Sequence, residues 1–126
     1  MLRDKTAVVT IGVKDIAVAK KFYEGALGLT SENDEDSGGV RYKSGSSYIF
    51  IYTSEYAGTN KATAVSWGVG EDINSVVHEL KDKGVKFEIY DMPNATLDGD
   101  IHIIGDLKTA WFKDPDGNIL NVVNKM

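Results

Sequence analysis

The side chains of this sequence that could perform acid–base or metal chemistry are few. The chain has two histidines, His78 and His102, and no cysteine, so it can form no disulfide, thiolate nucleophile or iron–sulfur cluster. His102 alternates with Ile101 and Ile103 in a strand-like run and therefore lies on the opposite face. In a cleft it could bind a polar group or act as a general base, and a hydrogen-bonded histidine without chemistry is the alternative. His78 is expected to be exposed on a helix.

A second candidate is an aromatic stripe on one predicted strand. Tyr48, Phe50 and Tyr52 alternate with Ile49 and Ile51, which predicts a strand with one aromatic and one aliphatic face. We expect the aliphatic face to pack under a helix. The aromatic face would then line a concave surface, where rings supply apolar area and tyrosine hydroxyls supply directional hydrogen bonds. The alternative is that these rings belong to the core.

Two further candidates lie near the C-terminus. Trp111 and Phe112 are adjacent on a predicted strand and must point to opposite faces, and we assign Trp111 to the cleft. Asn121 stands between the apolar residues Leu120 and Val122. Facing a cleft, its amide could donate to and accept from a ligand, while satisfying backbone groups is the alternative role.

Charge and composition exclude several classes of partner. The 126 residues carry 14 Lys and Arg against 19 Asp and Glu, a net charge of −5 without a basic cluster, so nucleic acid is not expected as a partner. No apolar run approaches the roughly 20 residues of a membrane helix, and no secretory signal precedes the first strand, so we expect a cytoplasmic protein that does not enter membranes. The aspartates of the second half have no spacing that would force a catalytic pair together.

The pattern of elements repeats once along the chain. Each half begins with a strand, then a helix that starts at an aspartate and ends at a glycine, and then short strands. The predicted strands lie at 6–13, 29–31, 39–42 and 48–53 in the first half, and at 63–69, 86–90, 100–105, 108–113 and 118–123 in the second. The helices lie between Asp15 and Gly28 and between Asp72 and Gly84. The acidic run 32–38 is interpreted as a solvated loop. These features predict an α+β protein with two βαβββ units, an internal duplication.

The sequence resembles the glyoxalase/bleomycin-resistance/dioxygenase superfamily, also called vicinal oxygen chelate proteins. The resemblance covers nearly the whole chain and is most specific at the turn Asp114-Pro115-Asp116-Gly117-Asn118 before the last strand. It implies one domain over residues 1–126, in which units of about 6–53 and 63–123, joined by a connector of about 54–62, pair within one chain. Their mixed sheets would curve around a cleft.

The resemblance also implies where a divalent metal would be held, with His, Gln or Glu as ligands. The corresponding positions here are Val8, then Ala64 or Val65 depending on whether a bulge lies near Gly70, and finally Asn121. Valine and alanine donate nothing to a metal, and asparagine offers only a neutral carbonyl. We therefore expect neither the family metal site nor another cofactor.

Our functional hypothesis is a small-molecule-binding protein similar to the bleomycin-resistance type, which binds by stacking in a dimeric cleft and sequesters its ligand. An apolar or aromatic compound would occupy a cleft lined by Tyr48, Phe50, Tyr52, His102, Trp111 and Asn121. The alternative is an enzyme, a glyoxalase-like lyase or dioxygenase with metal ligands at unmapped positions such as His102. A subunit that contributes only a dimer surface is a third hypothesis. A homodimer is expected, and the sequence leaves open whether the units pair within a chain or exchange between chains.

Overall fold

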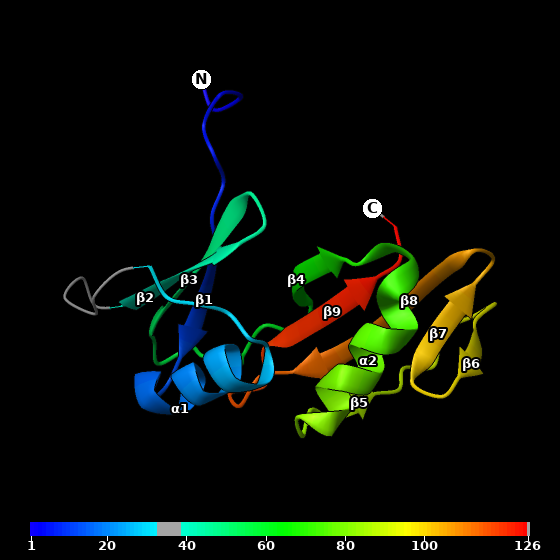
Figure 1. Cartoon of the computed structure of the whole chain (residues 1–126). Helices are drawn as coiled ribbons and strands as arrows, with labels where there is room; N and C mark the ends of the chain where they lie inside the picture. The colour runs from blue at the N-terminus through cyan, green and yellow to red at the C-terminus, as the bar shows by residue number, and fades with distance from the viewer. Residues whose placement is uncertain (33–38, 126) are drawn as a thin grey trace.

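The computed structural model describes residues 1–32 and 39–125, so most of the predicted acidic loop lies outside the described residues. Two units lie side by side (Figure 1). The first contains β1 (Val9–Val13), α1 (Ile16–Lys20), the π-helical turn η1 (Lys21–Ala26), β2 (Gly39–Ser44) and β3 (Ser47–Thr53). The second contains β4 (Thr63–Gly68), the 3-10 turn η3 (Gly70–Asp72), α2 (Ile73–Asp82), β5 (Phe87–Glu88), β6 (Thr96–Asp98), β7 (Ile101–Ile104), β8 (Leu107–Lys113) and β9 (Ile119–Val123).

The two predicted helices form, with different starts. Asp15 caps α1, since its Oδ1 accepts hydrogen bonds from the backbone N–H groups of Ala17 at 2.8 Å and Val18 at 3.3 Å. Asp72 stands at the start of α2 but makes no side-chain capping bond among the described residues. The turn η3 precedes α2 instead. Gly28 follows the first helix with φ of 74°, a conformation that glycine adopts without strain.

Each unit builds a mixed sheet, which confirms the predicted α+β class. In the first sheet the strand order is β1-β3-β2, with β1 parallel and β2 antiparallel to β3. In the second the order is β4-β9-β8-β7-β6, with β4 parallel to β9, and β5 also pairs with β8. The register irregularity of β4 lies between Thr63 and Val65, and it pairs Ser66 with Asn121.

The strand predictions differ from the structure in four places. The predicted strand 6–13 begins only at Val9. The run 29–31 forms only an isolated bridge, between Ser31 and Tyr42. The run 86–90 shortens to β5, because only Phe87 and Glu88 pair with β8. The strand β6 escapes prediction, because its three residues are all exposed and show no apolar alternation. It pairs with β7 as a hairpin that extends the second sheet.

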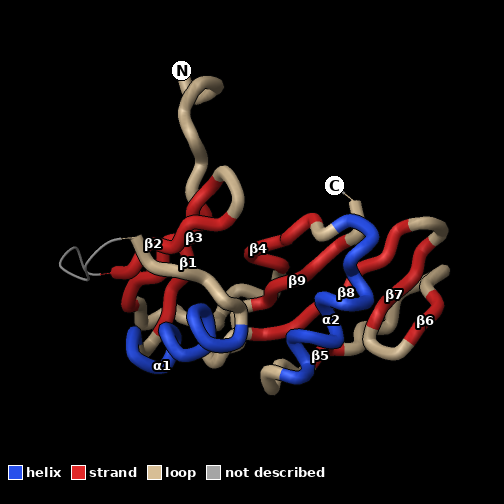
Figure 2. Tube along the Cα trace, in the orientation of Figure 1, coloured by secondary structure: helices blue, strands red, loops and turns tan. Residues whose placement is uncertain are grey.

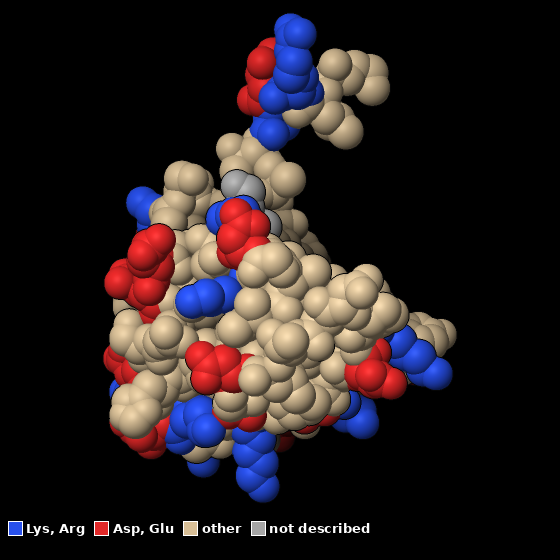
Figure 3. Space-filling view, turned by 90° about the vertical axis from the view of Figure 1, so that its right-hand side faces the viewer, with Lys and Arg blue, Asp and Glu red and all other residues tan. Residues whose placement is uncertain are grey.

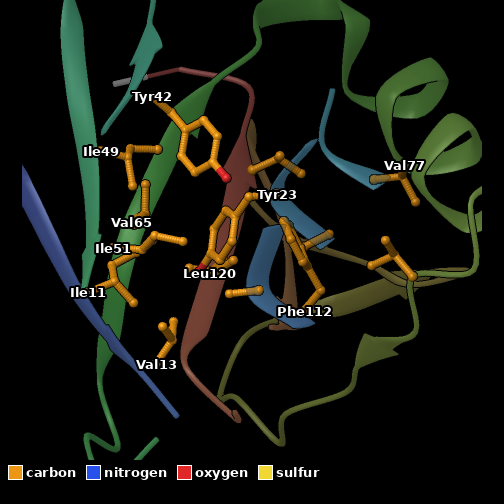
Figure 4. Packing of buried hydrophobic residues seen from close by; sticks show 14 of the residues in the cluster. Ile11, Val13, Tyr23, Tyr42, Ile49, Ile51, Val65, Val77, Phe112 and Leu120 are labelled. Carbon is orange, nitrogen blue, oxygen red and sulfur yellow. The ribbon is translucent and has the colours of Figure 1, made fainter. Parts of the chain in front are cut away.

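The core lies between the helices and the inner faces of the sheets. The two helices are seen in Figure 2; α1 packs against β3, and α2 packs against β8 and β9. Figure 4 shows Tyr23 and Tyr42 at the centre, with ring centroids 6.1 Å apart and planes inclined by 22°. Ile49 and Ile51 are buried beside them, as the alternation of the aromatic strand predicts. None of the helices in the described part of the chain has the length and apolarity needed to cross a membrane.

A buried hydrogen-bond network joins the two units. The hydroxyl of Tyr23 donates to Oδ2 of Asp114 at 2.7 Å. The side-chain amide of Asn118 donates to the same Oδ2 at 2.8 Å and to the carbonyl of Gly12 at 2.9 Å. The turn that carried the family resemblance therefore connects β1 and the first helix of one unit to β8 and β9 of the other.

Candidate functional site

Trp111 marks the outer face of the second sheet, the face turned away from the helices. On β8, Phe112 is buried in the core, and Trp111 points the other way and remains partly exposed. Its Nε1 donates to Oγ1 of Thr63 at 3.1 Å. The rings of Tyr90 and His102 meet its ring edge-to-face, with centroids at 5.3 Å and 5.1 Å. These contacts hold the indole in one orientation while leaving part of it accessible.

Two cavities adjoin Trp111, and they share Met92 as a second lining residue. The larger, of about 400 Å³, is also lined by Lys61, Ala62, Thr63, Tyr90 and Ile119. The smaller, of about 310 Å³, is also lined by Ser66, Ile104, Leu107, Thr109, Asn121, Val123 and Lys125. We call the two together the Trp111 cup. Figure 3, which views the molecule from the side of β6 and β7, shows a broad area without Lys, Arg, Asp or Glu between scattered charged residues.

Asn121 lines the cup, but its side-chain carbonyl oxygen is buried beneath that surface. Its Nδ2 donates to Oγ1 of Thr109 at 2.9 Å, and this hydroxyl donates onward to the carbonyl of Val122 at 3.1 Å. Because the single hydroxyl proton is used there, Thr109 can only accept from Asn121, which fixes the orientation of the amide. Oδ1 of Asn121 is buried and finds no hydrogen-bond partner among the described residues.

His102 lies under Trp111 with no exposed surface. Its Nε2 lies 3.0 Å from the backbone nitrogen of Tyr90 and 3.1 Å from the carbonyl oxygen of the same residue, so the backbone occupies this nitrogen in either tautomer. Nδ1 of His102 and the hydroxyl of Tyr90 are buried without partners among the described residues. An unsatisfied buried polar atom costs about 1–3 kcal/mol, and three such atoms surround one indole ring here.

The predicted aromatic stripe lies on the outer face of the first sheet. The rings of Phe50 and Tyr52 are nearly parallel, with centroids 6.3 Å apart, and the guanidinium of Arg41 lies 5.1 Å from the ring centroid of Tyr48. Tyr52 is 38% exposed, so the stripe is a surface and not core. Within the described residues, no ring contact or hydrogen bond connects it to Trp111. Tyr48 lines a further cavity of about 230 Å³ beside β4, which shares Ser66 with the smaller cavity of the cup.

The structure therefore brings three of the six predicted site residues together and leaves three apart. His102, Trp111 and Asn121 share the outer face of the second sheet, and the stripe residues form their own face. Sequence reasoning missed Tyr90, Met92 and Thr109. The alternation of β8 could have found Thr109, which lies two residues before Trp111 and so shares its face. Tyr90 and Met92 lie in irregular backbone, where no periodicity exists to reveal them.

The residues present do not fit the metal centre that the resemblance implies. Val8 is 42% exposed, and Val65 points into the core. The side chains nearest to Asn121 are the hydroxyl of Thr109 and, across the strands, Ser66 and Trp111. Neutral hydroxyl and amide groups are poor ligands for transition metals. Within residues 1–32 and 39–125, no three His, Cys, Asp or Glu side chains gather where they could hold an ion.

Comparison with solved structures relates this fold to known proteins. It is similar to the fosfomycin resistance protein FosX of Listeria monocytogenes, whose structure holds Mn(II) and 1S,2S-dihydroxypropylphosphonic acid. The two structures align with a TM-score of 0.72 at 14% sequence identity, and the alignment covers 100% of this chain and 93% of that chain. It is also similar to a glyoxalase family protein of Bacillus anthracis, with a TM-score of 0.69 at 20% sequence identity. This alignment covers 98% of this chain and 96% of that chain. An integron cassette protein from the Halifax Harbour sewage outfall metagenome has a TM-score of 0.69 at 17% identity, with 95% and 97% covered.

The sequence comparisons give the family. Comparison with curated proteins yields no match. The family model of the Glyoxalase/Bleomycin resistance protein/Dioxygenase superfamily matches residues 5–122. This match includes both units, the turn that joins them and all residues of the Trp111 cup except Lys125 and Val123. The chain belongs to the Glyoxalase/Bleomycin resistance protein/Dioxygenase superfamily.

Proposed function

We propose that this protein binds an apolar or aromatic small molecule in the Trp111 cup and sequesters it without a metal ion. The observation that carries the proposal is the ring of Trp111, which is partly exposed, is held in place by Thr63, Tyr90 and His102, and lines both cavities. A fixed aromatic ring in a mostly apolar cavity is a surface on which an aromatic ligand can stack. The volumes of the cavities, about 310 and 400 Å³, suit a small organic molecule.

The proposed ligand makes two kinds of contact. Trp111 offers a fixed and partly exposed ring for stacking, and stacked aromatic pairs contribute roughly 0.5–1.5 kcal/mol beyond the area that they bury. The hydroxyl and amide side chains that line the smaller cavity, among them Ser66 and Asn121, carry no charge and so suit an uncharged ligand. The phosphonic acid seen with Mn(II) in the FosX relative is not transferred to this chain, because the residues at the mapped positions do not supply a comparable donor set.

We propose further that two copies of the chain pair, and that the aromatic stripe of one copy covers the Trp111 cup of the other. Both surfaces support this arrangement, since each is apolar and uncovered in a single chain: Tyr52 is 38% exposed, and Trp111 is partly exposed. Large apolar surfaces of this kind are usually buried by a partner. In the pair, Tyr48, Phe50 and Tyr52 would line the same ligand site as Trp111 and Asn121.

Calorimetric titration with a tricyclic aromatic probe, acridine, tests the proposal. Wild-type protein should bind acridine with one saturable site per cup. The substitution Trp111→Ala should weaken binding by about 1–3 kcal/mol, because the stacking surface is lost. The matched control is Tyr56→Ala, which removes an aromatic ring that is 72% exposed and lines neither cavity. Absence of saturable binding, or equal affinity in wild type and Trp111→Ala, would count against the function.

A further inference from the structure

Another cavity lies on the opposite side of the second sheet from the Trp111 cup. This cavity, which we call the apolar crevice, has a volume of about 170 Å³ and lies between the two units. Its lining residues come from the chain after the first helix, from α2 and from the inner face of the second sheet. They are Leu27, Leu29, Trp67, Val69, Val76, Leu80, Phe112 and Val122. The crevice shares no lining residue with the cup.

The crevice offers almost no polar surface to an occupant. Seven of the eight lining side chains are pure hydrocarbon. The eighth, Trp67, has one polar atom, and its Nε1 already donates to Oγ of Ser44 at 2.9 Å. The Trp67 ring is also held in place, since it stacks on Phe112 with centroids 6.3 Å apart and an angle of 15°. A polar group inside the crevice would therefore lose its water partners without replacement.

The crevice is an incompletely packed region at the edge of the core. Phe112 and Val122 at its floor are buried, but the other six lining residues are only partly buried and pack against the core from its edge. Protein interiors are normally packed about as densely as organic crystals, with few voids larger than a water molecule. A neighbouring cavity, which is also lined by the charged residues Glu79 and Lys83, shares Leu27, Val76 and Leu80 with the crevice.

We propose that the apolar crevice is a second ligand site, for one compact and uncharged apolar molecule of about the size of benzene or toluene. The volume sets this size: an engineered protein cavity of about 150 Å³ lined by Leu, Ile and Phe stays dry and binds benzene or xenon. The lining determines the chemical class of the occupant, because its apolar side chains stabilise only apolar groups. The occupant touches Leu27 and Leu29 of the first unit and Val76 and Leu80 of the second, so its binding stabilises the contact between the units.

The two tryptophans allow the crevice to be tested separately from the cup. In the full-length Trp111→Phe variant, Trp67 is the remaining tryptophan, and it lines the crevice. Titration of this variant with bromobenzene should quench its emission saturably, because the heavy atom comes into contact with the Trp67 ring. Benzene should compete with bromobenzene and raise the melting temperature.

Substitutions at Val76 test whether bromobenzene occupies the crevice itself. In the same background, Val76→Thr keeps the side-chain shape and should weaken bromobenzene binding by about tenfold, because it replaces a methyl group of the apolar lining with a polar hydroxyl. Val76→Phe should fill the crevice and abolish the quenching. The matched control, Ser75→Thr, changes an exposed neighbour on α2 and should leave binding unchanged.

Three results would overturn the proposal. The first is quenching of Trp67 that rises linearly with bromobenzene and never saturates, which indicates collision in solution. The second is undiminished binding in the folded Val76→Phe variant. The third is a change of oligomeric state, measured by sedimentation, in the Val76→Phe variant. Such a change would indicate that the crevice is a contact surface between copies of the chain. None of these readouts involves acridine or the cup, so the second site and the proposed function can fail independently.

Discussion

The hydroxyl of Tyr23 donates a 2.7 Å hydrogen bond to Oδ2 of Asp114, and this buried bond links the helical segment of the first unit to the turn between β8 and β9. Burial, followed by the negative charge of Asp114, raises the pKa of the Tyr23 hydroxyl well above its ordinary value. The tyrosine thus keeps its proton in the folded protein at pH values where it ionises in the unfolded chain. The hydrogen bond between the two units therefore requires that the Tyr23 hydroxyl keep its proton.

The first prediction is a loss of stability at alkaline pH that depends on Tyr23. Because the folded pKa is raised, the stabilisation is fully present below the unfolded pKa of about 10 and is lost as the pH rises above it. Urea unfolding should show this decline beginning at about pH 10 and continuing as the pH rises further. Tyr23→Phe should cost roughly 1–3 kcal/mol at neutral pH and flatten the alkaline decline. An equally steep decline in Tyr23→Phe would contradict the prediction, and Tyr56→Phe, at an exposed ring, is the control.

The second prediction compares two buried asparagines. Since Oδ1 of Asn121 has no partner in the described structure, Asn121→Leu should leave the free energy of unfolding within about 1 kcal/mol of wild type or raise it, while weakening acridine binding. The control Asn118→Leu removes an amide that donates to Gly12 and Asp114, and should cost about 1–3 kcal/mol. Equal destabilisation in chemical denaturation would show that Asn121 is structural.

The third prediction compares the two tryptophans. Trp67 stacks on Phe112 at the edge of the core, so Trp67→Ala should lower the free energy of unfolding by about 3–5 kcal/mol with or without ligand. Trp111 is partly exposed on the outer face, so Trp111→Ala should cost clearly less and act chiefly on acridine affinity. Denaturation and titration of both variants measure the contrast. If Trp111→Ala destabilises the free protein as much as Trp67→Ala does, Trp111 belongs to the core.

The fourth prediction concerns oligomeric state. Sedimentation should report a particle of about twice the 13.8 kDa chain mass. Phe50→Glu, which places a charge in the aromatic stripe, should shift the particle toward the single chain. Tyr56→Glu, at an exposed aromatic outside the stripe, should not. Wild-type protein that sediments as a single chain at tens of micromolar would refute the pairing.

The fifth prediction concerns metal ions. Because the cup presents amide and hydroxyl groups instead of imidazole and carboxylate, adding Mn²⁺, Ni²⁺, Zn²⁺ or Fe²⁺ in excess should barely change the melting temperature. Metal analysis of purified protein should find no stoichiometric ion. A stoichiometric ion whose loss in Asn121→Leu matches a loss of thermal stability would place a metal in the cup and defeat the metal-free proposal.

Local pattern predicted much of this protein, including which way individual side chains point. The two-residue period of a strand placed Ile49 and Ile51 in the core, and the adjacency of Trp111 and Phe112 placed them on opposite faces. Asp15 was identified as a cap because capping involves groups only two or three residues apart. Such features depend on neighbours in sequence, and the sequence contains them in full.

Only the tertiary structure decided which faces meet. Alternation predicts two outward faces, but it does not specify whether the aromatic stripe and Trp111 share a cavity, and in one chain no described contact joins them. The roles of Tyr90 and Met92 depend on irregular backbone folding back over β8, and the unpartnered carbonyl of Asn121 depends on the single proton of Thr109 being used elsewhere. The sequence alone thus determined the family, the class of fold and the faces of residues in the strands that it predicted. Packing between distant segments determined the cup and the crevice, because their geometry depends on contacts that no local period records.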